Sequence, residues 1–375
     1  MTMPFGPKGS GDIRRTNPLP RGMSGFPAVG KGLGGRPARR ELFPEPTAIA
    51  FYSNGDYALD VFDAKFNRIT DIYANTQPTV SASASYEQMW KPPRQNKWMG
   101  MGSYGQGSNT KGAVIDISVT PWLVYENYTT ISNDGSGSSY IRNMAPGPSG
   151  FVAGIDSSTA GDESVNNITT KAEVTGQPAS FTSGSGDGTM KVYGNNLYVS
   201  RANGTRKYTF SAVNGVLILT ESNATINSAG SIAVSSDDAK VYVTSANILY
   251  VLNSSLVEIT TIDLSVYGLT APEAIEVSPD DKWLLICGTA NPSGRVLIMN
   301  TTDYSVRVMN VPLGVGSGRM LGCAWYADSN RYIVSGYSGA RTHVGKRTAG
   351  GTIKNLYADI FGNSGATFGV AIINY

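Results

Sequence analysis

Two stretches of this chain follow the same plan at a fixed distance, and this repeat limits the possible folds more than any other feature. In residues 231–262, an apolar run is followed by the turn Asp237-Asp238 and then by three further apolar runs. Residues 274–309 have the same order around Asp280-Asp281, 43 residues after the first turn. Four short runs separated by turn residues predict four antiparallel strands in sequence. A period of about 40 to 50 residues indicates that such units are arranged side by side.

Other parts of the chain contain the same unit. Residues 190–220 form four β-rich runs, and two of the connecting turns are Asn-Gly, the strongest hairpin signal. A further copy covers residues 322–334, and residues 59–72 fit a strand, a short turn and an outer strand. A meander of four strands is one blade of a β-propeller. Residues 47–375 are therefore predicted to form an all-β fold, a single propeller of about seven four-stranded blades.

Two of the expected blades are irregular, and the first blade is incomplete. Residues 78–175 are less regular, and we place one blade from Val80 to about Tyr128 and another from Tyr140 to about Val174. The C-terminal run 368–374 is apolar, and the first blade, which begins near Thr47, is short of one strand. We expect the C-terminal strand to complete that blade and close the ring, because exposed strand edges promote aggregation.

The first 46 residues differ in composition from the rest. They are rich in Gly and Pro and carry eight basic residues against three acidic ones. Such a segment buries too little apolar area to offset its ordering entropy, so we predict an extended N-terminal arm, residues 1–46, separate from the propeller. It is expected either to stay flexible or to order on a neighbouring subunit. Nucleic acid is not the expected partner, because the net charge is only +2 and no aromatic residues interleave the basic ones.

The segments AVSSDDAKVYVTS and IEVSPDDKWLLICG carry a family resemblance. They resemble the repeats of WD-repeat-like and YVTN-type β-propellers, although the Gly-His and Trp-Asp dipeptides of true WD repeats are absent. The basic arm, the low charge and the expected lack of a signal peptide also resemble virion proteins of tailed phages. These resemblances imply a non-catalytic structural or assembly protein of a virion, associated with the tail or the capsid and made in the host cytoplasm.

The implied partners are other virion structural proteins, in a homo-oligomer or ring assembly, with no membrane-spanning segment. The expected partner-binding residues belong to the arm and to a basic loop flanked by tryptophans: Arg14, Arg15, Arg36, Arg39, Arg40, Trp90, Arg94 and Trp98. Two alternatives stay open. One is a carbohydrate-binding or glycan-cleaving propeller, and the other is a cellular scaffold for protein interactions.

The sequence offers little catalytic chemistry. The chain has one histidine, His343, expected in a loop or at an edge, and no metal-ligand spacing, so no metal, cofactor or enzymatic activity is expected. Cys287 and Cys323 are expected as buried free thiols, with a disulfide left open. A glycan-cleaving propeller needs two carboxylates that face a central cleft. Strand alternation allows six acidic residues to face inward: Asp60, Asp116, Glu126, Asp156, Glu173 and Glu276.

Overall fold

A computed structural model describes most of residues 47–374. The stretches outside the description lie between strands, and the longest are 75–88, 127–139, 311–318 and 357–366. The chain divides into two units, residues 1–40 and 41–375, and residues 1–46 lie outside the described part. The predicted boundary of the arm therefore remains a prediction. In the described part, no helix is long and apolar enough to cross a membrane.

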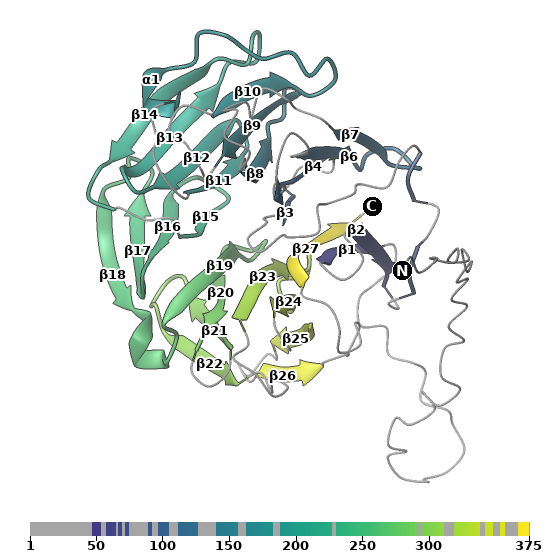
Figure 1. Ribbon diagram of the computed structural model, residues 1–375. Coiled ribbons are helices and arrows are strands. Elements are labelled where there is room, and N and C mark those ends of the chain that lie inside the picture. The colour runs from purple at the N-terminus through teal and green to yellow at the C-terminus, as the bar shows by residue number, and fades with distance from the viewer. Residues whose placement is uncertain are drawn as a thin grey trace, which may run out of the picture. The chain divides into compact units, whose positions relative to one another are not determined.

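The described part of unit 2 is built from seven antiparallel sheets, labelled in Figure 1. The strands of sheets 1 to 3 are as follows. Sheet 1 contains β1 (Thr47–Ser53), β2 (Ala58–Asp63) and β27 (Thr367–Asn374). Sheet 2 contains β3 (Met89–Trp90), β4 (Trp98–Met101), β6 (Ala113–Asp116) and β7 (Leu123–Glu126). Sheet 3 contains β5 (Ser103–Tyr104), β8 (Tyr140–Pro146), β9 (Phe151–Asp156) and β10 (Ser164–Asn167).

Sheets 4 to 7 are regular four-stranded meanders. Sheet 4 contains β11 (Gly188–Tyr193), β12 (Asn196–Arg201), β13 (Gly204–Phe210) and β14 (Leu217–Asn223). Sheet 5 contains β15 (Ile232–Val234), β16 (Lys240–Ser245), β17 (Ile248–Asn253) and β18 (Glu258–Asp263). Sheet 6 contains β19 (Ala271–Val277), β20 (Trp283–Thr289), β21 (Arg295–Asn300) and β22 (Val306–Asn310). Sheet 7 contains β23 (Arg319–Trp325), β24 (Arg331–Tyr337), β25 (His343–Arg347) and β26 (Ile353–Leu356). Two short helices, α1 (Ala179–Thr182) and the 3-10 helix η1 (Leu264–Tyr267), complete the described elements.

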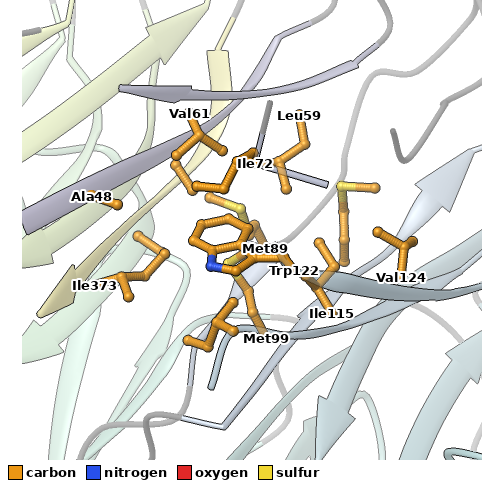
Figure 2. Close-up of a cluster of buried hydrophobic side chains, with 14 of the residues drawn as sticks. Ala48, Leu59, Val61, Ile72, Met89, Met99, Ile115, Trp122, Val124 and Ile373 are labelled. Carbon is orange, nitrogen blue, oxygen red and sulfur yellow. The ribbon is translucent and has the colours of Figure 1, made fainter. Parts of the chain in front are cut away.

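The C-terminal strand joins the N-terminal one, as predicted. β27 pairs antiparallel with β1, with Ala50 opposite Ala371 in the register. A hydrophobic cluster then joins sheet 1 to sheet 2, and Figure 2 shows Trp122 in its midst, near Ala48 and Ile373 of sheet 1 and Met99 of sheet 2. Trp122 is fully buried. A second cluster, which includes Ile49 and Ile333, joins sheet 1 to sheet 7. Sheet 1, which contains β1 and β27, thus packs against the sheets on either side through two hydrophobic clusters; closure of the whole ring remains a prediction.

The repeated turns that the sequence predicts also link neighbouring sheets. Asp238, Asp281 and Ser329 follow the first strands of sheets 5, 6 and 7, and all three have positive φ, between 54° and 62°. The Asp238 carboxylate accepts a hydrogen bond from Tyr198 of sheet 4 at 2.9 Å. The Asp281 carboxylate accepts one from the backbone N–H of Ser236 at 2.8 Å. Asp tolerates the left-handed region better than most residues, which explains its use at two of these turns.

The irregular region departs from the simple meanders expected there. β5 lies between β4 and β6 in the sequence, yet it pairs with β8 and so belongs to sheet 3. The outer strand expected near residues 67–72 is reduced in the described part to a bridge between Phe62 and Arg68. His343 is not at a loop or an edge. It lies in β25, between β24 and β26, and is 1% exposed.

Candidate functional site

The first strands of successive sheets surround a cavity of about 850 Å³. β11, β15, β19 and β23 follow one another in space, as Figure 1 shows, and β27 and β3 lie beyond β23. Residues of all six strands line the cavity. Cavities of roughly 300 to 1,000 Å³ are typical of small-molecule sites. This central cavity is therefore large enough for a ligand of sugar size.

Lys191 projects into the cavity from β11. Strand alternation places Lys191 and Tyr193 on the same side of β11, and both line the cavity. The Lys191 ammonium donates a hydrogen bond to the backbone carbonyl of Ile275 in β19 at 2.9 Å. Sheet 5, with its first strand β15, lies between the sheets of β11 and β19. The Lys191 side chain therefore spans part of the cavity. Lys191 is 7% exposed, and burial lowers its pKa, while nearby Glu276 opposes the shift.

Glu276 is a carboxylate that shares the cavity with this lysine. It is half-buried on β19 and lines the same cavity. Burial raises the pKa of Glu276 to about 7, although Lys191 and Lys91 both act to lower it. Burial likewise lowers the pKa of Lys91, which follows β3 and lines the cavity. A carboxyl group with a pKa near neutrality can accept a proton and return it, which is what a general base requires.

Hydrogen bonds to the backbone hold Glu276 in place. The Trp325 indole N–H donates to the Glu276 carbonyl at 2.9 Å. The Ser231 hydroxyl accepts from the Ile275 N–H at 3.3 Å. β19 is therefore fixed from both neighbouring sheets next to the Glu276 carboxyl. Preorganisation of this kind improves catalytic positioning.

Asp237 and Asp238 also line the cavity, and both belong to the inter-sheet turn of sheet 5. Besides the Tyr198 bond, Asp238 accepts hydrogen bonds from the Asn196 amide at 2.6 Å and from the Lys207 ammonium at 3.1 Å. Asp237 accepts one from the Ser235 hydroxyl at 2.7 Å. No group of three or more His, Cys, Asp or Glu side chains that could hold a metal ion occurs in the described part of the chain. The hydrogen bonds of Asp237 and Asp238 therefore explain both carboxylates as turn residues.

Of the six carboxylates considered from the sequence, Glu276 is the one found among the described lining residues of the cavity. Asp60 is buried and pairs with Arg68, and Asp116 accepts hydrogen bonds from Ser118. Glu173 is exposed, and the side chains of Glu126 and Asp156 lie outside the description.

The predicted partner-binding residues are mostly outside the described part. Arg14, Arg15, Arg36, Arg39, Arg40 and Arg94 fall there, and for Trp90 only its place in β3 is described. Trp98 is 4% exposed and packs edge-on against Tyr125, with ring centroids 6.0 Å apart. Its ring therefore belongs to the core, and the binding role of this loop stays a prediction.

The cysteines are free and buried, as expected. Lys191 was not singled out from the sequence, and Lys91 was considered only as part of the basic loop flanked by tryptophans. The signal for Lys191 was present, because a charged residue interrupts the apolar first strand of a repeat, as Glu276 does two repeats later.

Comparison with known proteins supports the fold. A candidate 6-phosphogluconolactonase of Bacteroides fragilis is similar at a TM-score of 0.63 and 12% identity, over 88% of this chain and 98% of that one. A candidate 6-phosphogluconolactonase of Bacteroides uniformis has a TM-score of 0.58 at 13% identity, over 87% and 99% of the two chains. The periplasmic gluconolactonase of Pseudomonas aeruginosa has a TM-score of 0.53 at 14% identity, over 87% and 98%. No family model and no curated protein sequence matches this chain.

These likenesses establish the class of fold, a β-propeller, and correct two expectations. The expectation of a non-enzymatic protein is wrong, because structures that share nearly the whole fold are named as lactonases, which are enzymes. The virion interpretation finds no support in them, and localisation in a virion is untested. Identities of 12% to 14% show the fold alone, so the activity of this chain is a matter for proposal.

Proposed function

We propose that this protein is a hydrolase that opens a small carbohydrate-derived lactone in the central cavity. The observation that carries the proposal is the meeting of Glu276, whose pKa is about 7, with the amino groups of Lys191 and Lys91 in one cavity. The printed names of the structural neighbours support the choice of a lactone. The proposal follows the carbohydrate-directed alternative drawn from the sequence.

Hydrolysis of a lactone adds water across the ring ester bond. In the proposed reaction, the Glu276 carboxylate accepts a proton from water as the oxygen attacks the carbonyl carbon. Negative charge then develops on the carbonyl oxygen, and an ammonium group in a site of low dielectric stabilises it. The ring C–O bond breaks, and the Glu276 carboxylic acid returns its proton to the leaving alkoxide. The product is a hydroxy acid.

The two lysines lie at different places in the cavity, and we assign them different roles. Lys191 is held by the Ile275 carbonyl, so its charge stays near one point of the cavity. Lys91 is half-buried on a different wall. We assign oxyanion stabilisation to Lys191, and binding of the substrate's polar groups to Lys91.

The test is hydrolysis of glucono-δ-lactone and of 6-phosphoglucono-δ-lactone, followed as acid release and corrected for the spontaneous reaction. We expect enzyme-dependent hydrolysis that Glu276→Gln and Lys191→Met reduce by about 100-fold or more, as is usual for a general base or an oxyanion group. Glu258→Gln is the matched control, because Glu258 is exposed on β18, an outer strand. Equal rates for Glu276→Gln and the wild-type protein would refute the assignment.

A further inference from the structure

Cys287 and Cys323 form a pair that the proposed hydrolysis does not use. Cys287 lies on β20 and is fully buried, whereas Cys323 lies on β23 of the neighbouring sheet. The Cys287 sulfur is 3.7 Å from the carbonyl oxygens of Met320 and Gly322, and Gly322 directly precedes Cys323. Both cysteine side chains belong to one buried cluster. The two side chains therefore lie near each other across the boundary between sheets 6 and 7.

The two thiols differ in access. Cys323 lines the central cavity, and Cys287 is not among the lining residues described. A small molecule that enters the cavity can therefore reach Cys323, and Cys287 lies behind it. The neighbouring Cys287 side chain and burial raise the pKa of the Cys323 thiol well above its ordinary value. The thiolate is the reactive form of a cysteine, and a raised pKa lowers its fraction. Oxidation of Cys323 therefore needs a reactive oxidant.

The backbone at this point is irregular. The register between β23 and β24 shifts between Met320 and Gly322, the two residues whose carbonyls lie against Cys287. A bulge of this kind disrupts the ladder locally and re-aims side chains. A disulfide requires an S–S distance of about 2.05 Å, and a bulged segment can make that approach more easily than a regular ladder.

We propose that Cys323 and Cys287 are a modification site, where a hydroperoxide entering the cavity produces a reversible disulfide between sheets 6 and 7. The Cys323 thiol loses its proton as its sulfur attacks one peroxide oxygen, the O–O bond breaks, and the proton passes to the leaving oxygen, so that a sulfenic acid and one water (or alcohol) form. The Cys287 thiol then attacks the Cys323 sulfur and displaces a second water. The peroxide is reduced by two electrons, and two thiols are oxidised. This inference does not depend on the proposed hydrolysis.

The native full chain is treated with hydrogen peroxide, quenched, and denatured with a thiol-alkylating reagent. We expect monomer that has lost two hydrogens, that takes up no alkylating reagent, and that yields a peptide linking Cys287 to Cys323. Dithiothreitol should restore both thiols. Thermal unfolding of the oxidised chain should shift to a higher temperature, because the new bond constrains the unfolded state.

Cys287→Ser is the matched control. It keeps a small polar group at the same place, so Cys323 should gain oxygen atoms without forming a link. The proposal is overturned if wild-type protein keeps two alkylatable thiols after peroxide, or if Cys323 gains oxygen while Cys287 stays free. Because the readout is mass, neither result depends on whether the chain hydrolyses lactones.

Discussion

Replacing Glu276 with glutamine should make the protein more stable at alkaline pH and leave it nearly unchanged in acid. The ordinary pKa of the side chain is 4.5 and its folded value is about 7. As the pH rises from 4.5 to 7, the unfolded chain releases this proton while the folded chain retains it, so stability falls through that window. Above pH 7 the side chain has lost its proton in both states, so the loss of folding free energy no longer changes with pH. A difference of about 2.5 pKa units corresponds to about 3 kcal/mol.

The measurement is urea unfolding of wild type and Glu276→Gln at about pH 4.5 and about pH 8, with Glu258→Gln as the exposed control. At the lower pH, glutamine resembles the protonated side chain, and the two proteins should differ little. At the higher pH, the variant should exceed wild type by about 3 kcal/mol. If the variant is instead less stable than wild type at pH 8, the carboxylate forms a net stabilising pair with Lys191. The inference that the pKa of Glu276 is raised would then be wrong, and so would its role as general base.

Three further substitutions test the packing that supports the cavity. Tyr198→Phe should cost about 1 kcal/mol in urea unfolding and show coupling to Asp238→Asn in a double-mutant cycle, because it removes one hydrogen bond between sheets 4 and 5. Arg201→Met should cost about 3 to 5 kcal/mol, because it leaves Glu163 without its buried partner at 2.6 Å; a cost near zero would refute the pairing. Trp122→Ala should cost about 3 to 5 kcal/mol, as expected for a fully buried aromatic side chain at the boundary of sheets 1 and 2 (Figure 2), and unchanged stability would contradict that packing.

The regular part of the fold was predictable because local signals agree there. In sheets 5 and 6, apolar alternation, Asp turns and spacing all indicate the same strands, and the turns at Asp238 and Asp281 are where the repeat places them. The pairing of β5 with β8 in sheet 3 was not predictable. A strand of two residues has no periodicity, and its pairing depends on tertiary contacts.

The candidate site was predictable only in part. Glu276 was one of six acidic residues that alternation allowed to face inward, and nothing local distinguished it from Asp60, which pairs with Arg68 instead. Lys191 interrupts an apolar first strand, but a lysine within a strand usually reaches solvent, so this signal did not place its amino group in the cavity. Its bond to Ile275 joins β11 to β19, and only the arrangement of three sheets brings these residues together.

The pH dependence of kcat/KM for lactone hydrolysis tests the central claim most directly, because it reports the ionisation of the general base in the free enzyme. The account predicts a rate that rises with pH through a midpoint near 7, the pKa of Glu276, and a loss of that limb in Glu276→Gln. Enzyme-dependent hydrolysis that keeps the same profile in the variant would show that another group is the base. Hydrolysis no faster than in buffer alone would contradict the proposed function.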